Sequence, residues 1–452
     1  MRLRRVAMLA MLCGFPALAE AQAQVDPQPV PLGVNGQLKP WLQVRGELRT
    51  RVEGFTGGGF GESAGSKDAY WMDRFRLNAT VRPAKSLAFV VQAQDARAFS
   101  KTAGSQAAPF RDTLDLRMAY AEIGSARVVR LGRQELAFGE QRLLGHLAWA
   151  NTARSFDGAR ATIKGKLGQI DGFAASVVTI DPKGFDKSGN GNVIAGTYVS
   201  LTTVVPKQTL EPYFFWRQSR NLVAELGGVD DLHQATSGVR MAGKVPLALD
   251  YSGELAVQTG SVGPDDVMAW AGHGVVGKTL NGVPGSPRMF GEYNYASGDA
   301  DATDGTRGTF DQLYPTGHDK LGLSDQVGWK NIHNARAGIE IRPTPKWLLA
   351  GSYHSWWLAS ATDGLYSASG ALVARSTAGT AGSHVGQEID AQVSFVYSPQ
   401  LQIGGGYAHL VPGEFLKNTT PGRSYKAPYV MVTYVFLGEQ PATRVIGGGK
   451  AQ

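Results

Sequence analysis

The chain has 452 residues and a formal net charge of +7, with 43% hydrophobic and 18% charged residues. A single cysteine excludes a disulfide scaffold and a cysteine-rich zinc module, and 9% aromatic residues argue against intrinsic disorder. Beyond about the first two dozen residues, no apolar run reaches the roughly 18–20 residues that a membrane-spanning helix needs. With 58 glycines in addition, these proportions favour a large all-β protein.

Residues 1–23 have the features of a secretory signal peptide. A basic stretch at residues 2–5 precedes an apolar stretch at residues 6–18, and the small residues that follow offer cleavage sites. The alternative is a short membrane anchor, but the apolar stretch is too short to span a bilayer. Cys13 lies inside the signal, so the exported protein has no cysteine. A leader at residues 24–38 follows, which we expect in the periplasm.

From residue 39 onward, polar and apolar residues alternate in short segments. In segment 41–52, Arg45, Glu47 and Arg49 share one face, and Leu48 lies on the other. A helix would distribute these charges all round its surface, so the period of two indicates a strand. Eighteen such segments follow one another, at 41–52, 70–82, 87–97, 114–124, 126–138, 155–163, 168–180, 196–205, 208–219, 231–244, 247–259, 267–278, 287–295, 329–342, 347–358, 384–397, 401–410 and 425–436.

The connections between these segments alternate in length. Short turns follow the even-numbered segments, and longer glycine-rich loops, such as 139–154 and 296–328, follow the odd-numbered ones. Outer-membrane barrels combine an even strand number with short periplasmic turns and long extracellular loops. We therefore predict an all-β fold: a transmembrane antiparallel β-barrel of eighteen strands over residues 39–436 in the bacterial outer membrane. Residues 437–452 form a periplasmic tail. A soluble β-sandwich array or β-helix is the alternative that hydropathy leaves open.

Two motifs of catalytic type are interpreted as chance matches. Residues 272–279 match the phosphate-binding loop pattern, but Pro284 and its neighbours cannot begin the helix that phosphate binding requires. Residues 61–65 match a serine nucleophile elbow without the strand and helix that should flank it. Ser352 and His354 share a strand face, yet nothing else singles them out. We therefore predict no enzyme and no cofactor, and a lipid-hydrolysing barrel or an adhesin remains the alternative from another class.

Metal binding has one weak candidate. The eight histidines are scattered without the spacing of a zinc site. Asp299, Asp301 and Asp304 lie in the longest loop, but their spacing departs from the helix–loop–helix calcium motif. A solvated acidic turn is the favoured interpretation.

The polar strand faces carry the chemistry. Guanidinium groups suit carboxylates because the planar fork bonds both oxygens, so a bore rich in arginine indicates a path for anionic solutes. The alternative is a polar lumen whose charges cancel. By alternation, the predicted lumen receives Arg45, Glu47, Arg49, Arg51, Arg74, Arg76, Asp115, Arg117, Arg130, Arg160, Arg217, Arg240, Lys244, Glu254, Arg288, Glu292, Arg336 and Glu340.

Three stretches resemble a known family. Residues 131–143 read LGRQELAFGEQRL, residues 149–160 read WANTARSFDGAR, and residues 309–318 read TFDQLYPTGH. Together they resemble the alginate export family of outer-membrane porins. The resemblance implies an eighteen-stranded barrel with an arginine-rich constriction that passes a polyuronate. It further implies that the following residues form the constriction or anchor a loop: Arg130, Arg133, Glu135, Arg142, Arg154, Asp157 and Arg160.

One departure from that family bears on the substrate. Its exporters carry a long periplasmic turn near the C-terminus, whereas the corresponding turn here is only residues 398–400. We expect a channel for anionic solutes or an acidic polysaccharide such as alginate. Uptake of small organic anions and general diffusion are the alternatives. The expected partners are outer-membrane lipid and the anionic solute. Periplasmic export proteins are a further candidate, and no nucleic acid is expected.

Overall fold

The computed structural model describes residues 38–436. The expected signal peptide (1–23), all but the last residue of the leader (24–38) and the tail (437–452) lie outside the described residues. Within the described chain, no helix is long and apolar enough to cross a membrane.

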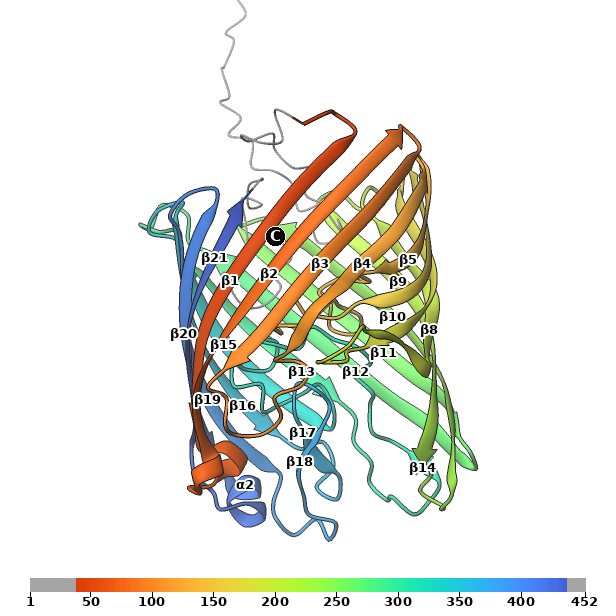
Figure 1. Cartoon of the computed structure of the whole chain (residues 1–452). Coiled ribbons are helices and arrows are strands. Elements are labelled where there is room, and N and C mark those ends of the chain that lie inside the picture. Colours follow the sequence, from red (N-terminus) through yellow and green to blue (C-terminus); the bar gives the residue numbers. More distant parts are fainter. Residues whose placement is uncertain (1–37, 437–452) are drawn as a thin grey trace, which may run out of the picture.

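Eighteen strands form a closed antiparallel barrel, as predicted (Figure 1). Each strand pairs with its neighbours in the chain, and β21 closes the ring by pairing with β1 from Gly46↔Phe436 to Thr56↔Lys426. The strands are β1 (Leu42–Thr56), β2 (Lys67–Ala84), β3 (Leu87–Phe99), β4 (Asp112–Gly124), β5 (Arg127–Gln134), β6 (Phe156–Gly165), β7 (Gly168–Thr179), β8 (Lys187–Leu201), β9 (Gln208–Val223), β10 (Val229–Val245), β11 (Leu249–Val262), β12 (Asp265–Thr279), β13 (Arg288–Ala296), β15 (Ile332–Ile341), β16 (Trp347–Trp357), β19 (His384–Val396), β20 (Leu401–Pro412) and β21 (Tyr425–Phe436).

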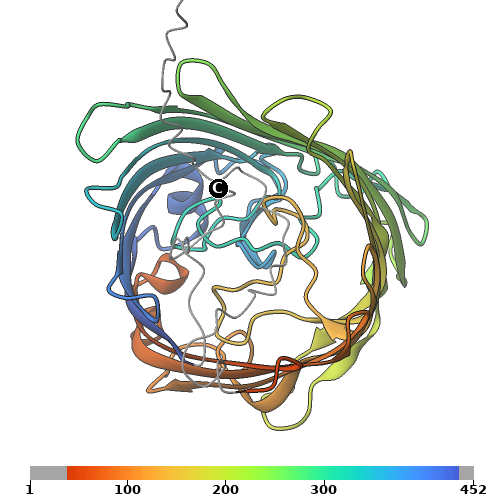
Figure 2. The ribbon, with the colours of Figure 1, turned by 90° about the horizontal axis from the view of Figure 1, so that it is seen from above.

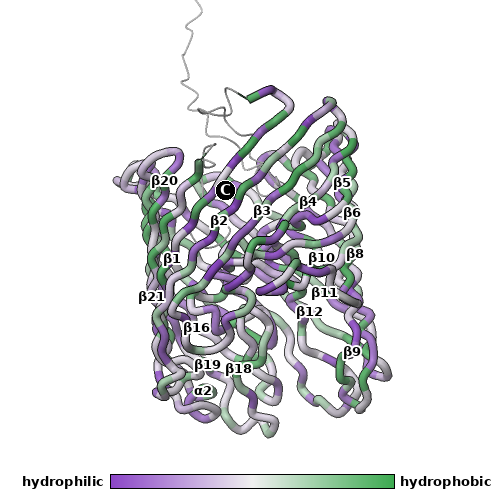
Figure 3. The backbone as a smooth tube through the Cα atoms, viewed as in Figure 1, coloured by the Kyte–Doolittle hydropathy of each residue, from purple (hydrophilic) through white to green (hydrophobic). Residues whose placement is uncertain are grey.

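The alternating pattern follows from strand geometry. Successive side chains point to opposite faces of a strand, so one face of β1 meets lipid and the other meets the lumen. Leu48 and Val52 are exposed on the outside, whereas Arg49 and Arg51 are buried on the inside. Figure 3 shows hydrophilic and hydrophobic residues alternating along β1 to β4. The apolar outer face is what a bilayer requires.

The two ends of the barrel differ as the connection lengths predict. The start of β1 and the end of β21 both lie at the rim that bears the short turns (Figure 1). The turn between β19 and β20 spans residues 397–400, as short as predicted. The opposite rim bears the long loops, apart from two short connections at residues 224–228 and 263–264.

One strand boundary was predicted wrongly. Strand β8 begins at Lys187, whereas the sequence predicts its start at residue 196. The glycine- and asparagine-rich stretch at residues 189–192 is typical of a loop, yet Lys187 and Ser188 pair with the end of β7. The register shift between Ser176 and Val178 accommodates the irregular stretch. Pairing with a neighbouring strand therefore overrides the local preference.

Several short elements lie within the loops. They are η1 (Gly58–Phe60), η2 (Ala64–Ser66), β14 (Thr306–Arg307), β17 (Gly364–Tyr366), β18 (Leu372–Arg375) and α2 (Glu414–Thr419). Strand β14 pairs in parallel with β12, and β17 pairs with β18 as a small hairpin. Residues 272–279 lie wholly within β12, which leaves no helix for phosphate. Residues 61–65 lie in the loop around η2, without a strand-to-helix elbow.

Candidate functional site: a lumen crossed by two loops

Two long loops fold back into the barrel (Figure 2). We call them the first inner loop (residues 135–155, between β5 and β6) and the second inner loop (residues 297–331, between β13 and β15). Their backbones bond to each other: Tyr314 N donates to Leu143 O and Gly145 N donates to Tyr314 O, both at 2.9 Å. Thr316 N donates to Gln141 O at 2.9 Å. The loops therefore form one unit inside the wall.

Apolar packing holds this unit against one side of the lumen. Phe138 of the first inner loop stacks on Phe173 and Tyr198 of the wall, with ring centroids 5.3 and 4.9 Å apart. Leu144 and Phe310 are fully buried in the same cluster. Such burial is worth about 1.5–3 kcal/mol per large side chain, so the loops have a defined place in the bore.

Arg154 joins the two loops. Its Nη1 donates to the carbonyls of Tyr314 at 2.6 Å, Pro315 at 3.0 Å and Gly145 at 3.1 Å. Burial lowers the pKa of Arg154 to about 10, so the group keeps its charge at neutral pH. Arg154, predicted as a constriction or loop-anchoring residue, lies between the two inner loops and bonds both of them.

The wall of β1 and β2 presents a cluster of arginines to the first inner loop. Arg49 donates to the carbonyls of Ala148, Trp149 and Ala150 at 3.0–3.2 Å. Arg74 bonds two of the same carbonyls at 3.2 and 3.3 Å, and it pairs with Glu47 at 2.5 Å. The carbonyl acceptors of Arg49 are neutral and leave its charge uncancelled, whereas the charge of Arg74 is paired with Glu47.

An aromatic stack reinforces this contact. The guanidinium of Arg51 lies 3.8 Å from the centroid of the Trp149 ring. The Trp149 ring also stacks nearly parallel on His318 of the second inner loop, at 3.8 Å, and Tyr429 of β21 contacts it edge-on at 4.8 Å. Arg51 also donates to Trp149 O at 2.7 Å. The wall and both inner loops therefore meet at one tryptophan.

The lumenal charge is uneven. Facing the bore, residues 43–53 of β1 and 70–80 of β2 carry five arginines and two glutamates, whereas β13, β15, β16 and β19 carry two arginines and four acids. The two groups lie on neighbouring parts of the ring, because only β20 and β21 separate β19 from β1. The lumenal charge therefore changes sign along the wall between these groups of strands.

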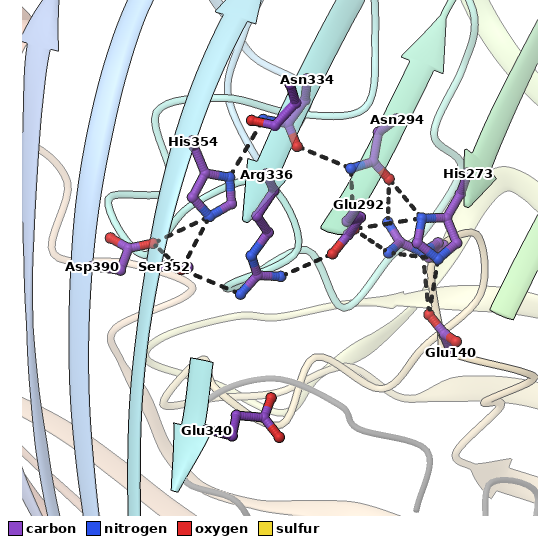
Figure 4. A network of polar contacts seen from close by, with 12 residues as sticks. Glu140, His273, Glu292, Asn294, Asn334, Arg336, Glu340, Ser352, His354 and Asp390 are labelled. Atoms are coloured by element: carbon purple, nitrogen blue, oxygen red, sulfur yellow. Dashed lines mark hydrogen bonds and ion pairs between the residues drawn. The ribbon is translucent and has the colours of Figure 1, made fainter. Parts of the chain in front are cut away.

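The acidic side is organised by a network that spans five strands (β12, β13, β15, β16 and β19) and the first inner loop (Figure 4). Arg142 donates to Glu292 at 2.8 Å and to Asn294 at 3.1 Å, and it lies 3.4 Å from Glu140. Arg336 bonds the other oxygen of Glu292 at 3.2 Å. The network fixes the first inner loop against β13 through Arg142.

The charge of Glu140 depends on this network. Burial alone would raise the pKa of Glu140, but Arg240, His273 and Arg142 hold that pKa well below its usual value. Arg240 bonds Glu140 at 3.0 Å and also pairs with Glu211 of β9. The buried carboxylate is therefore ionised and held by cations from two sides.

Ser352 and His354 do meet an acid, but not in the arrangement of a catalytic triad. Ser352 Oγ lies 3.4 Å from His354 Nε2, and Asp390 Oδ2 lies 3.4 Å from that same nitrogen. In a triad, the acid orients the imidazole through Nδ1, which here lies 3.4 Å from Asn334. Asp390 and Glu388 instead accept backbone N–H groups of the second inner loop, at Leu323 and Ser324.

The remaining predicted residues line the wall in local pairs. Arg133 grips Asp157 with two bonds of 2.8 and 3.1 Å, and Arg160 bonds Asp171 at 2.9 Å. Further predicted cations also lie beside an acid: Arg117 with Glu135, Arg130 with Glu122 and Arg288 with Glu340. Two predicted residues have uncharged partners instead: Arg76 donates to Gln94, and Glu254 accepts from Tyr213. Arg45 faces Asn78 in the ladder of β1 and β2, and Asp115 accepts the backbone N–H of Asp186.

The acidic candidate in the second inner loop makes local turns. Asp299 accepts from the backbone N–H of Asp301 at 3.0 Å, and Asp304 accepts from that of Thr306 at 2.7 Å. Asn, Asp and Ser side chains commonly close turns in this way. Among the described residues, these three acids do not form a group with metal-ligand spacing.

Sequence reasoning missed the residues that hold the loops in place. Glu140, Trp149 and Asn294 carry no periodic signal, because two of them lie in a loop and the third is an uncharged residue of β13. Their partners are distant in sequence: Arg142 and Asn294 are 152 residues apart. The one available signal was the dense mixture of Glu, Arg and aromatic residues in a loop, where solvated polar residues are expected.

The family model for alginate export matches residues 40–430. The chain belongs to this alginate export family. The family and the closed barrel place this porin in the bacterial outer membrane, where its apolar face contacts lipid. The family is one of porins and not of enzymes.

Solved porin-like structures share the fold at low identity. OccK11 (OpdR) of Pseudomonas aeruginosa is 14% identical with a TM-score of 0.56, covering 87% of this chain and 96% of that one. OccAB2 of Acinetobacter baumannii is 13% identical with a TM-score of 0.57, covering 87% and 98%. A BenF-like porin of Pseudomonas fluorescens Pf-5 is 11% identical with a TM-score of 0.59, covering 87% and 98%. Comparison with curated protein sequences gives no match.

Proposed function

We propose that this porin passes anionic solutes, and that an acidic polysaccharide such as alginate is the first candidate. The observation that supports this is the β1–β2 wall, where Arg49 and Arg76 bond neutral oxygen atoms. Arg49 contacts three carbonyls and the Asn151 amide oxygen, and Arg76 Nε donates to Gln94 at 2.8 Å. Arg74 pairs with Glu47 and Arg51 with Glu53 on the same wall, so Arg49 and Arg76 supply the positive charge that would attract carboxylates.

Passage needs no covalent step. An anion enters along the positive wall, and guanidinium groups replace part of its hydration shell by paired hydrogen bonds. Acids such as Glu47, which already holds Arg74, limit how tightly each arginine binds. A solute must bind well enough to enter and weakly enough to leave. The solute then moves down its own gradient.

A second candidate solute is a small organic anion. The specific observation in its favour is the pair of inner loops, which bond to each other across the bore and leave less room for a polymer. The short turn at residues 397–400 also departs from the exporters that the sequence resembles. General diffusion without charge preference is the third alternative. In each case, the concentration gradient of the solute sets the direction of transport.

The test is a planar bilayer recording with a tenfold salt gradient. We expect a reversal potential of anion-preferring sign, and a shift toward zero in the double variant Arg49→Gln, Arg76→Gln. Arg423→Gln is the matched control, because Arg423 is exposed and pairs with Glu62 in the loops at the rim. Cation preference in the wild type would refute the proposal.

Graded oligouronates then separate the two solutes. Block that deepens with chain length supports the polysaccharide, and block by monomers alone supports small anions. General diffusion is supported if neither monomers nor longer oligouronates block the current and if anions and cations permeate equally.

A further inference from the structure

Three aspartates meet at the rim that bears the long loops. Asp112 and Asp115 lie at the start of β4, and Asp186 lies in the connection between β7 and β8. One carboxylate oxygen of each lies within 4.8 Å of those of the other two. Asp112 and Asp115 are almost fully buried, with 1% and 3% of their surfaces exposed.

The local backbone directs both β4 acids inward. In a regular strand, residues three apart point to opposite faces. Leu114 breaks the alternation: its φ is 40°, and the register of β3 against β4 shifts beside it. Leu114 itself is 66% exposed on the outside. The bulge therefore places two carboxylates on the same side.

Asp186 reaches these acids because β5 and β6, the two strands between β4 and β7, are short. Strands β5 and β6 have 8 and 10 residues, against 13 and 12 in β4 and β7. The connection at residues 180–186 lies over this gap, and Pro182 O accepts from Thr113 Oγ1 at 3.2 Å. Asp186 N donates to Asp115, so the contact is specific.

The nearby cation does not neutralise the cluster. Arg133 is held by Asp157 through two hydrogen bonds of 2.8 and 3.1 Å, and it lies 3.9 Å from Asp115. It contacts Asp186 only through the backbone carbonyl, at 3.0 Å. One guanidinium thus faces four carboxyl groups, so this cation alone does not balance their charge.

A buried oxygen atom independently points to a missing ligand. Asp112 Oδ2 accepts from Gln94 at 2.8 Å, whereas Asp112 Oδ1 is buried without a hydrogen-bond partner in the described structure. Leaving a buried carboxylate oxygen unsatisfied is costly. This oxygen is neither exposed to solvent nor hydrogen-bonded by the protein. A bound cation would supply the missing contact.

We propose that Asp112, Asp115 and Asp186 bind one calcium ion. All three supply carboxylate oxygens, which hard divalent cations prefer. At Ca–O distances of about 2.3–2.6 Å, ligand oxygens on opposite sides of the ion are about 4.6–5.2 Å apart, whereas Mg²⁺ at about 2.0–2.1 Å requires about 4.0–4.2 Å. Carboxylate oxygens that all lie within 4.8 Å of one another can bind one calcium ion, and the ion would tie the 180–186 connection to β4 at the rim.

Protonation is the competing way to relieve the repulsion. Burial and the charges of Asp112 and Asp115 raise the pKa of Asp186 to about 7, although a backbone hydrogen bond and Arg133 oppose the shift. A proton in the cluster would remove one negative charge and could also supply a donor within it. The two possibilities differ in their response to calcium at fixed pH.

The experiment uses the folded full-length porin in detergent, freed of metal with a chelator. Equilibrium dialysis with radioactive calcium at pH 7.5 should give one site with a dissociation constant of about 10⁻⁴–10⁻³ M, as in extracellular calcium modules. Terbium luminescence offers a second probe of the same site. Asp186→Asn should weaken binding at least tenfold, and Mg²⁺ should compete poorly.

Two further variants keep the test decisive. Asp301→Asn, at an exposed acid of the other acidic loop, should bind calcium like the wild type. Asp186→Lys supplies a fixed cation in place of the ion, so it should abolish calcium binding while the barrel still shows its folded mobility on unheated gels. Absence of saturable calcium binding, equal binding of Mg²⁺, or unchanged binding in Asp186→Asn would overturn the proposal.

Discussion

Removal of the Arg154 side chain should release the two inner loops from each other. Arg154 donates to Gly145 in its own loop and to Tyr314 and Pro315 in the second one. In Arg154→Ala, all three carbonyls lose this donor at once. The backbone bonds between residues 141–145 and 314–316 remain, so the loops should loosen rather than unfold.

The size of the effect follows from the number of bonds. A hydrogen bond from a charged donor is worth about 1.5–3 kcal/mol, but water can enter the lumen and replace part of each. We therefore expect a loss of about 3–5 kcal/mol in the free energy that holds the loops together. Since about 1.4 kcal/mol corresponds to a factor of ten, the ratio of released to docked loops should rise about 100-fold or more.

Single-channel recording measures this directly. Arg154→Ala should show larger mean conductance and more frequent transitions between conductance levels than the wild type. Arg154→Lys keeps the charge but lacks the planar fork, so it should lie between them. Arg423→Ala removes an exposed arginine at the rim and should behave like the wild type.

Unchanged conductance and noise in a folded Arg154→Ala variant would refute this reasoning. It would mean that apolar packing alone positions the loops. A conductance change of equal size in Arg423→Ala would likewise contradict it, because any loss of positive charge would then suffice.

Three further outcomes are expected. Gly132→Val should reduce assembly of the heat-modifiable barrel in outer membranes, because Gly132 has φ +121° and an added Cβ would lie 2.3 Å from a carbonyl oxygen of β4. Trp149→Ala should raise current noise, because the stack with Arg51 and His318 contributes about 0.5–2 kcal/mol per contact; noise equal to that of the wild type would contradict this. Burial and a hydrogen bond with Asp299 raise the pKa of Glu225 to about 7, against about 4.3 in an unfolded chain. Between these two pH values, Glu225 is protonated in the folded protein and ionised in the unfolded chain. This stabilisation is present at low pH and lost as pH rises past 7; protease cleavage at residues 224–228 should therefore increase from pH 5 to 8 in the wild type, and Glu225→Gln should abolish that increase.

The barrel could be predicted because its determinants are local and repeated. Alternation at Arg45, Glu47 and Arg49 against Leu48 specifies a strand with one wet face, whichever strands lie beside it. Connection length then distinguishes the two rims. Strand β8 was placed wrongly because the ladder with β7, rather than local composition, keeps residues 187–195 extended.

The lumen could be predicted only in part. The sequence indicates which wall residues face the bore, but pairing decides what their charge does. Arg133 and Arg160 are each matched by an acid, whereas Arg49 bonds neutral carbonyls. Carbonyl acceptors are present at every residue and leave no mark in the sequence.

The sequence by itself determined an exported, eighteen-stranded barrel with arginine-rich polar faces. The period of two and the alternating connection lengths are local features, so they can be recognised without knowing which strands are neighbours. The tertiary structure decided that the loops at residues 135–155 and 297–331 fold inward and that the charges divide into a basic and an acidic side. Contacts such as Arg154 with Tyr314 join residues 160 positions apart. Only the closed ring brings such residues together, and the energy of burial then fixes them.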